Sequence, residues 1–583
     1  MSIIKNIFSI NKDGNAKIKY NLLMFLSISL FIFAPDYTLL LLGKISFVKN
    51  TPIIIALFLF SFLLAFSGKI LQTILVLFIL VIQIMNVGYL VYSGMQIGPT
   101  EIDLAFYEKG DVLMLSNILP FLWLVPVFFV PFGLILFLMI KYKNKMIFSP
   151  FCFIFVVLVV MWMFQRAYNK SFARTQPYPS RMTIHNSLNI FPYVITHIGK
   201  IENVKVPTQL VKTYDIKKVK EDTPRLIVMI YGESTNWVEM KILNEKLDRN
   251  TTPKLIEMFN KDKDRHLAMR AVGSGASTTS AHPLFWNMVN MPTDVNKIIM
   301  TKKQNILELA KKNGYKTHWI SAQVNKYLEI SGSAPDDVVS SEDTLHIKSF
   351  QQKHDDHLIE LFEKMDLSQG KHFVVLHPYA CHSPYDDNWM QRGRDKYRQF
   401  KSNSSEIGIQ KRDEYHNCML YLDDLLAKLF EMAKEKGADY IFFTPDHSEI
   451  ISNDDGTPCV SKDCVYGHVT VDEKVIRIPF LAYSKDNFVE MKKEFEKHKI
   501  TSHYEIGKYL AKLIGYEVVN PFECENDFYV HAPRALGDYQ LMKLTRDGEK
   551  ITPIFKGVLS EFVAGGYNEC GKGDIKTLVQ KKK

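Results

Sequence analysis

Metal-binding side chains follow two apolar runs at the points where each run ends. Glu233 comes after the run 226–230, and Asp446 and His447 come after the run 440–443. Because the carboxyl ends of parallel strands meet at the ligand crevice of an α/β sheet, we expect these three side chains to lie together. Carboxylate and imidazole groups are ligands of transition metals such as zinc. Either run alone is more commonly an ordinary loop cap, but the two together favour a metal site.

A turn rich in small and hydroxyl-bearing residues lies between these runs in the sequence. It reads Gly-Ser-Gly-Ala-Ser-Thr-Thr-Ser-Ala-His-Pro over residues 273–283 and leads into an apolar segment. Such a turn can present a hydroxyl group at the start of a helix, where the helix dipole and a bound dication both stabilise an alkoxide nucleophile. The simpler alternative is an N-cap in a loop of glycine and serine residues.

Three histidines form a second group of candidate site residues. His377 and His382 follow the apolar run 373–376, and His468 lies beyond the second metal-binding segment. Imidazoles in these positions can bind a phosphate, protonate a leaving group or hold a second metal. Most of the 17 histidines in the chain are expected to be structural or solvent-facing.

The first 165 positions are dominated by apolar stretches that reach or approach the length needed to cross a bilayer. The five stretches cover residues 20–42, 52–67, 70–91, 120–140 and 146–164. Lysines cluster before the first stretch and between the fourth and fifth, and basic residues favour the cytoplasmic side. We therefore expect a five-span transmembrane domain over residues 1–165 that exports the carboxy-terminal half of the chain.

The exported part is expected to contain two regions. Residues 166–215 mix aromatic, basic and polar side chains, which is typical of an interfacial connector. From 216 to 583, short apolar runs alternate with helical periodicity, so we expect an α/β domain with a largely parallel sheet covered on both faces. The segment beyond about residue 521 predicts a small antiparallel addition.

Charge and cysteine content narrow the possible partners and compartment. The net charge is +9, but the basic residues are interleaved with acidic ones, which argues against a nucleic-acid partner and fits membrane topology and anionic lipid neighbours. Six of the seven cysteines lie in the predicted exported part, where disulfides are permitted. Cys459 can pair with Cys464, and Cys524 with Cys570, although the sequence does not fix the connectivity.

Several ordered motifs together resemble the phosphoethanolamine transferases, a membrane family related to the sulfatases and alkaline phosphatases that includes the colistin-resistance enzymes. The motifs are Gly232-Glu233-Ser234, Thr278 five positions before Pro283, His377 to His382-Ser383-Pro384, Tyr415-x-Asn417-x-x-x-Tyr421-x-Asp423, Asp446-His447-Ser448-Glu449 and Tyr466-x-His468. The resemblance implies a membrane-anchored enzyme with a sulfatase-like catalytic domain. It also implies the bacterial inner membrane, with the catalytic domain in the periplasm.

The resemblance also assigns roles to individual residues. Glu233, Thr278, Asp446 and His447 would ligate a zinc ion, and Thr278 would be the nucleophile. His382, His468 and His377 would contact the phosphoryl group or a second zinc ion. Lys326 lies near the family's substrate-binding lysine, and Glu108 near its donor-binding glutamate.

The implied reaction transfers phosphoethanolamine from phosphatidylethanolamine to an envelope acceptor through a phosphothreonine intermediate. Lipopolysaccharide, at lipid A or a core sugar, is the expected acceptor, and modification of lipid A would confer polymyxin resistance. We expect a monomer that binds the membrane. The alternatives are phosphoglycerol transfer, another sulfatase-like phosphodiester reaction, and a non-enzymatic receptor for glycans or lipids. Sulfatase activity is disfavoured because the hydroxyl-rich turn lacks a Cys or Ser followed by x-Pro-x-Arg.

Overall fold

The computed structural model divides the chain into two compact units, Met1–Val204 and a larger unit that begins at Lys205. It describes residues 14–42, 51–93, 97, 125–142, 146–169, 182–188 and 215–558, except for 291–301, 386–394, 405, 461–465, 469–471, 521–522 and 532–539. The predicted boundaries at residues 165 and 215 stay predictions.

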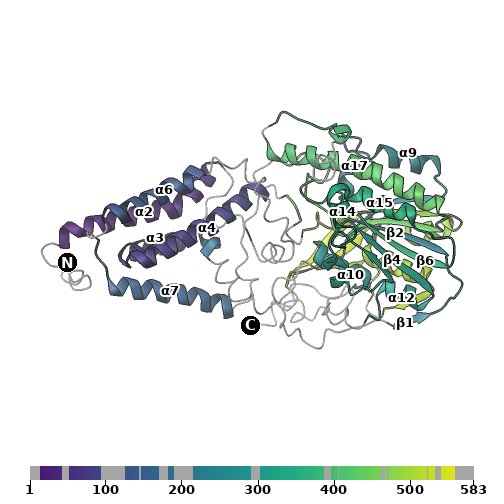
Figure 1. Ribbon diagram of the computed structural model, residues 1–583, viewed down its shortest axis with the longest axis horizontal. Helices are drawn as coiled ribbons and strands as arrows, with labels where there is room; N and C mark the ends of the chain where they lie inside the picture. Colours follow the sequence, from purple (N-terminus) through teal and green to yellow (C-terminus); the bar gives the residue numbers. More distant parts are fainter. Residues whose placement is uncertain are drawn as a thin grey trace. The chain divides into compact units, whose positions relative to one another are not determined.

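The N-terminal unit is helical, and each predicted apolar stretch contains a helix (Figure 1). The helices are α2 (Gly14–Leu41), α3 (Thr51–Phe66), α4 (Lys69–Ser93), α6 (Val125–Lys141) and α7 (Pro150–Asn169). Among the described residues, two helical segments, Ile18–Leu41 and Lys69–Val91, are long and apolar enough to cross a membrane. The other three contain shorter apolar segments of 10–17 residues, so the full set of five spans stays a prediction.

Part of the predicted connector is anchored within this unit by buried polar groups. Asp36 on α2 accepts hydrogen bonds from the backbone N–H groups of Thr183 at 2.6 Å and Ile184 at 3.3 Å. Asn86 on α4 donates through its side chain to the Thr183 carbonyl at 3.1 Å. Buried polar groups need such partners, so these bonds hold the helical turn at 183–188 against α2 and α4.

The larger unit is built on an eight-stranded sheet with the order β5-β4-β6-β2-β7-β8-β3-β9. Strand β8 runs antiparallel to its neighbours β7 and β3, and the other adjacent pairs are parallel, which confirms the largely parallel sheet. The strands are β2 (Leu226–Gly232), β3 (His266–Val272), β4 (Tyr315–Ser321), β5 (Asp337–Val339), β6 (Lys371–His377), β7 (Tyr440–Pro445), β8 (Arg477–Ser484) and β9 (Ile500–Ser502).

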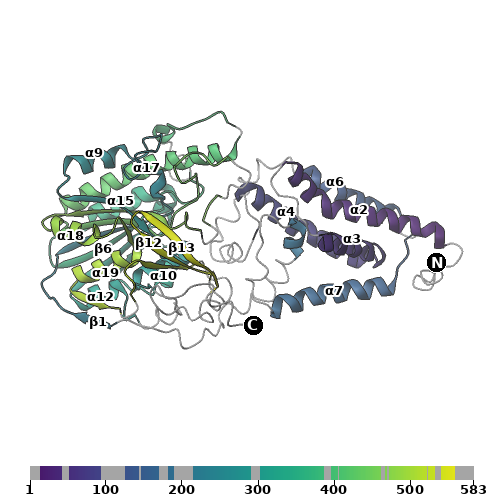
Figure 2. The same ribbon diagram turned by 180° about the vertical axis from the view of Figure 1, so that it is seen from behind.

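Helices cover both faces of this sheet (Figures 1 and 2). On one face lie α9 (Pro253–Lys261), α14 (Ile347–Lys353), α15 (Asp355–Lys364) and α17 (Ile407–Glu435). On the other lie α10 (Thr278–Trp286), α12 (Ile306–Lys312), α18 (Phe488–Phe495) and α19 (His503–Leu513). Strand β2 is buried throughout, and its alternate residues feed the two cores: Val228 and Ile230 pack into one, Ile227 and Met229 into the other.

Two smaller sheets complete the unit. Strands β11 (Asp527–His531), β12 (Gln540–Asp547) and β13 (Lys550–Val558) form an antiparallel sheet beyond residue 521, the region where the sequence predicts an antiparallel addition. Strands β1 (Asp215–Lys218) and β10 (Tyr516–Val519) pair antiparallel. The remaining short elements are α13 (Lys326–Ser331) and two 3-10 turns, Trp237–Glu239 and Asp395–Tyr397.

Two of the cysteines predicted to form disulfides do so. Cys459 and Cys524 are disulfide-bonded. Their expected partners, Cys464 and Cys570, lie outside the described residues. Cys152, Cys381 and Cys418 are buried free thiols.

The start of α17 packs closely on the segment that leads to His468, and Gly408 makes this approach possible. A Cβ atom at Gly408 would overlap the Cys459 carbonyl oxygen and the Tyr466 hydroxyl. The Tyr466 hydroxyl itself donates to that carbonyl at 2.6 Å. We expect Gly408→Ala to lower the free energy of unfolding by about 1–3 kcal/mol, because one of these groups must move.

Thermal unfolding of the full chain in detergent measures this effect. Gly88→Ala is the matched control, because Gly88 lies in helix α4 with nothing within 4 Å of the added Cβ. Equal melting temperatures for Gly408→Ala and wild type would contradict the close packing.

Candidate metal centre and nucleophile

The sheet register brings the two metal-binding segments side by side. Strands β2 and β7 are parallel neighbours, and Gly232 pairs with Pro445 at their carboxyl ends. Glu233 and Asp446 are the next residues on the two chains, so both carboxylates emerge at the same edge of the sheet. A Cβ at Gly232 would contact the Phe443 ring, which explains the small residue before Glu233.

The distances from His447 Nε2 to the other candidate ligand atoms fit a four-coordinate zinc ion. His447 Nε2 lies 3.3 Å from Glu233 Oε1, 3.4 Å from Asp446 Oδ2 and 3.3 Å from Thr278 Oγ1. Ligands at about 2.0–2.2 Å from a tetrahedral zinc ion are separated by about 3.3–3.6 Å, which matches these distances. Among the described residues, Glu233, Asp446 and His447 form the one group of three or more acidic, histidine or cysteine side chains close enough to share a metal.

Thr278 is the first residue of α10, at the helix end that favours negative charge. Its side chain is 2% exposed. Ser277 and Ser280 form a capping box that fixes the helix start. The hydroxyl of Thr278 is therefore held beside the candidate metal ligands.

The turn before Thr278 is held by the C-terminal antiparallel sheet, which the sequence did not indicate. His531 at the end of β11 donates its backbone N–H to the Ser274 carbonyl at 3.0 Å, and its carbonyl accepts from Ala276 N–H at 3.1 Å. Between these residues, Gly275 lies so close to Ala281 that a Cβ atom would overlap its backbone nitrogen. Thr278 thus depends on residues far along the chain for its position.

The site holds two buried carboxylates and therefore favours a cation. Burial and the nearby Glu233 carboxylate raise the pKa of Asp446 to about 7. Burial alone would lower the pKa of His447, but the Asp446 and Glu233 carboxylates outweigh it and raise that pKa to about 10. Without a metal, a proton on His447 supplies the positive charge that balances this site.

Zinc binding is therefore expected to release protons and to strengthen as pH rises. His447 is protonated below pH 10 in the metal-free site and must be neutral to bind zinc, and Asp446 adds a second proton below pH 7. We expect release of about one proton per zinc at pH 8 and close to two at pH 6. Titration calorimetry in buffers of different ionisation enthalpy measures this number. Affinity that does not change between pH 6 and pH 8 would contradict the ligand set.

Gln323 is a partner of the metal site that the sequence analysis missed. It lies two residues beyond β4, and its side-chain amide donates to Glu233 Oε2 at 2.9 Å and to the Pro378 carbonyl at 3.1 Å. Ser234 donates to the other oxygen, Oε1, at 2.7 Å. These bonds fix the orientation of the Glu233 carboxylate. The strand-end rule that identified Glu233 also applies to Gln323, but no motif drew attention to it.

His468 lies directly beside His447, with ring centroids 4.2 Å apart. Its Nδ1 contacts Glu449 Oε1 at 2.6 Å, and Glu449 also accepts from the Tyr385 hydroxyl at 3.2 Å. The buried Glu449 carboxylate accepts this hydrogen bond, so Nδ1 of His468 carries a proton and the ring is held in one orientation. Nε2 is the ring nitrogen that Glu449 does not contact.

Burial alone would raise the pKa of Glu233, but the hydrogen bond and charge of His447, followed by the charge of His382, hold that pKa well below its usual value. His382 therefore lies close to the candidate metal ligands. Its Nδ1 contacts the Ser383 carbonyl at 2.7 Å, and its ring stacks on Tyr379 at 4.8 Å. These contacts hold the ring near the metal ligands.

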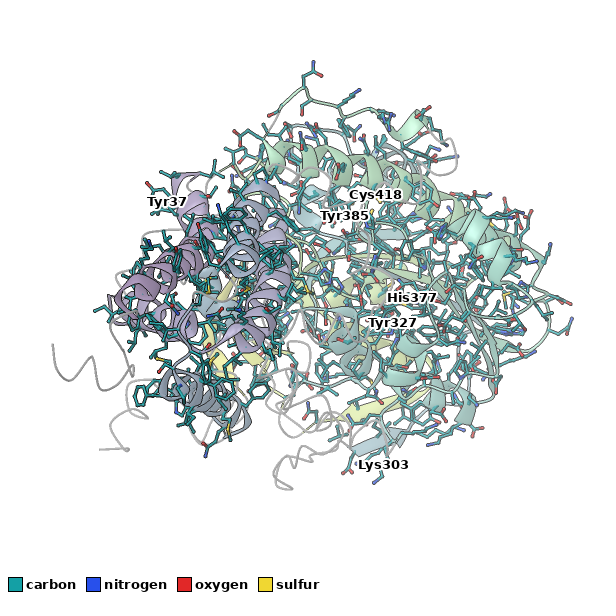
Figure 3. The ribbon with its side chains drawn as sticks, turned by 60° about the vertical axis from the view of Figure 1, so that its left-hand side comes forward. Tyr37, Lys303, Tyr327, His377, Tyr385 and Cys418 are labelled. Atoms are coloured by element: carbon teal, nitrogen blue, oxygen red, sulfur yellow. The ribbon has the colours of Figure 1, made fainter. Side chains whose placement is uncertain are left out.

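His377 is fully buried at the carboxyl end of β6. Its Nδ1 contacts the Ser321 hydroxyl at 3.0 Å, and its ring lies 5.0 Å from that of His282 and 6.4 Å from that of Tyr327 (Figure 3). Burial lowers the pKa of His377 to about 4, so it is neutral at pH 7.

The two remaining predicted residues are not placed at the site. Lys326 begins α13, but its side chain lies outside the described residues. Glu108 also lies outside them. Their roles stay predictions.

Comparison with known proteins places this geometry in a family. The sulfatase family matches residues 225–516, half of the chain, and the chain belongs to it. A putative transferase of Escherichia coli K12, YhbX, is 24% identical over 230 residues, which cover 38% of this chain and 37% of that protein. The phosphoethanolamine transferase EptC of the same strain is 21% identical over 252 residues, 40% of this chain and 41% of that protein. The chain thus spans less than half the length of these relatives.

One solved structure matches the fold over most of the chain, and a second was found with a lower score. The integral membrane lipooligosaccharide phosphoethanolamine transferase A of Neisseria meningitidis superposes with a TM-score of 0.55 at 13% identity, over 85% of this chain and 95% of that one. The periplasmic domain of E. coli EptC, solved in complex with zinc, gives a TM-score of 0.44 at 18% identity over 55% of this chain and 93% of that one. The predicted resemblance to the phosphoethanolamine transferases is confirmed.

Proposed function

We propose that this protein transfers phosphoethanolamine from phosphatidylethanolamine to an acceptor in the cell envelope, with Thr278 as the nucleophile. The observation that supports this proposal most directly is the Thr278 hydroxyl, 3.3 Å from His447 Nε2 among the metal ligands. A receptor that only binds glycans or lipids has no need of a hydroxyl in that position.

The reaction has two balanced steps. Thr278 Oγ1 attacks the phosphorus of the donor lipid, the bond from phosphorus to the glycerol oxygen breaks, and diacylglycerol leaves with a proton. An acceptor hydroxyl or protonated phosphate oxygen then attacks the phosphorus of this intermediate and loses its proton; the bond from phosphorus to Thr278 Oγ1 breaks, which leaves phosphoethanolamine on the acceptor and regenerates Thr278. A zinc ion bound by Glu233, Asp446 and His447 would lower the pKa of the nucleophile and neutralise charge on the phosphoryl oxygens.

The proton transfers fall to the histidines beside the ligands. His468, held by Glu449, would protonate the departing glycerol oxygen and then accept the proton of the acceptor. His382 would bind the phosphoryl oxygens. The apolar N-terminal helices would keep the catalytic unit at the bacterial inner membrane with the donor lipid at high local concentration, the proximity that can supply up to about 7–11 kcal/mol.

The donor is tested by incubating the purified full chain in detergent with phosphatidylethanolamine or phosphatidylglycerol, followed by intact-mass analysis and measurement of released diacylglycerol. We expect a mass gain of one phosphoethanolamine group with the first lipid and none with the second. An adduct from phosphatidylglycerol alone would replace the proposal with phosphoglycerol transfer. A zinc-loaded protein that releases diacylglycerol from neither lipid would contradict phospholipid-headgroup transfer.

A further inference from the structure

A buried histidine outside the predicted motifs lies between the two loops that carry the reaction. His503 is the first residue of α19, at the carboxyl end of β9, and its side chain is fully buried. The strand β9 pairs in parallel with β3, whose end leads into the nucleophile turn. The imidazole therefore reaches the active-site loops from the edge of the sheet.

One nitrogen of His503 contacts the nucleophile turn. The backbone N–H of Ser274 donates to His503 Nδ1 at 3.1 Å, and the Ser274 hydroxyl lies 3.2 Å from the same atom. Ser274 lies four residues before Thr278 and is also bonded to His531 on its carbonyl side. His503 thus holds the N–H group of Ser274, and β11 holds the carbonyl group of the same residue.

The other nitrogen contacts the loop that carries the metal ligands. His503 Nε2 lies 2.9 Å from the carbonyl oxygen of Pro445, the residue before Asp446. A carbonyl can only accept, so Nε2 carries the proton, and Nδ1 is the acceptor for the Ser274 N–H. Both bonds require one neutral tautomer, in agreement with burial, which lowers the pKa of His503 to about 3.

We propose that His503 is a positioning residue that fixes the distance between the nucleophile and the metal ligands by bridging Ser274 and Pro445 through its two ring nitrogens. This inference rests on the proposed roles of Thr278 and of the zinc site. The Nε2 bond orients the Asp446-His447 segment, and the Nδ1 bond orients the turn that presents Thr278. The two bonds therefore have separable effects.

Two conservative substitutions divide the contacts. In His503→Asn the side-chain oxygen occupies the place of Nδ1 and still accepts from Ser274 N–H, but the bond to Pro445 is lost. In His503→Gln the side-chain amide nitrogen occupies the place of Nε2 and still donates to Pro445, but the acceptor for Ser274 is lost. His503→Phe removes both and keeps the ring. His266→Asn is the matched control, because this buried histidine begins β3, at the opposite end of the strand from the nucleophile turn, and its Nδ1 contacts the Asp262 carbonyl at 2.8 Å.

Two measurements on the full chain in detergent test the proposal: zinc affinity by chelator competition, and the rate of adduct formation with saturating zinc and phosphatidylethanolamine. We expect His503→Asn to weaken zinc binding by about 10–100-fold, the usual effect of losing a group that orients a ligand. We expect His503→Gln to bind zinc within about threefold of wild type but to form the adduct about 10–100-fold more slowly, because Thr278 is displaced.

Two results would overturn the proposal. Equal losses of zinc affinity and of adduct rate in both variants would show that the two bonds do not act separately. No loss in either variant would show that neither bond positions the site. His503→Phe is expected to show both defects, and His266→Asn neither. A wild-type protein that binds zinc but forms no adduct would contradict the proposed donor or nucleophile; the zinc affinities of the variants would still decide whether the Pro445 bond positions the ligands.

Discussion

Thr278→Ala is expected to abolish phosphoethanolamine transfer while the protein still binds zinc. The substitution removes the attacking oxygen, and losing the nucleophile of a covalent mechanism costs on the order of 10⁴-fold or more in turnover. The charged ligands Glu233 and Asp446 and the His447 imidazole remain, so zinc affinity should fall by no more than about tenfold. Peptide mass spectrometry after incubation with phosphatidylethanolamine is expected to find the adduct on Thr278 in wild type and no adduct in the variant.

The neighbouring threonine provides the control. Thr279 is the next residue of α10, and its hydroxyl lies 3.0 Å from that of Ser277 rather than at the metal ligands. Thr279→Ala should transfer the headgroup at a rate within about threefold of wild type. Thr278→Ser, which restores a hydroxyl, should recover part of the activity. An adduct on Thr279 or on a serine of the turn in the wild-type protein would show that Thr278 is not the nucleophile.

Asp446→Asn is expected to weaken zinc binding more than 100-fold. Loss of a group that only orients a ligand costs about 10–100-fold in metal affinity, and loss of a ligand should cost more. The same substitution should leave the metal-free protein as stable as wild type, or more stable, at pH 8. Folding raises the pKa of Asp446 from 3.8 to about 7. The protonated carboxyl therefore contributes to the free energy of unfolding below pH 3.8, and this contribution is lost as the pH rises through 7. Asparagine removes this unfavourable charge and keeps the oxygen that accepts from Ser234 and His447 N–H groups.

Thermal unfolding with and without zinc separates these two effects. Zinc at 100 times the wild-type dissociation constant should stabilise wild type by about 2.7 kcal/mol and Asp446→Asn by less than about 0.4 kcal/mol. Asp439→Asn is the matched control: this residue lies at the other end of β7, where its carboxylate accepts from Arg225 N–H at 2.7 Å and Leu226 N–H at 3.0 Å. That variant should bind zinc as wild type does. A destabilised metal-free Asp446→Asn protein would contradict the electrostatic account of the site.

The residues at the ends of central strands were the part of the site that the sequence could predict. Strands β2, β6 and β7 are fully or almost fully buried, so they appear in the sequence as continuous apolar runs. Glu233, His377 and Asp446 interrupt or follow these runs, and the rule that ligands bind at the carboxyl ends of parallel strands then brings them together.

The residues that support the site were not predictable in the same way. His503 follows β9, a strand of three residues that is too short to form a recognisable apolar run. His531 contributes through its backbone, so its side-chain type carries no information about that contact. Both reach the nucleophile turn through pairings between distant parts of the chain, which local periodicity does not encode.

The bonds between His531 and the nucleophile turn also have a consequence for biogenesis. The turn comes early in the sequence of the larger unit, whereas β11 is among the last described strands of that unit. Until β11 has been synthesised and has folded, the Ser274 carbonyl and the Ala276 N–H group lack their His531 partners, so a partly synthesised chain has an incomplete turn. Because a late strand completes the turn that presents Thr278, a chain that ends before β11 is expected to lack a correctly held nucleophile turn.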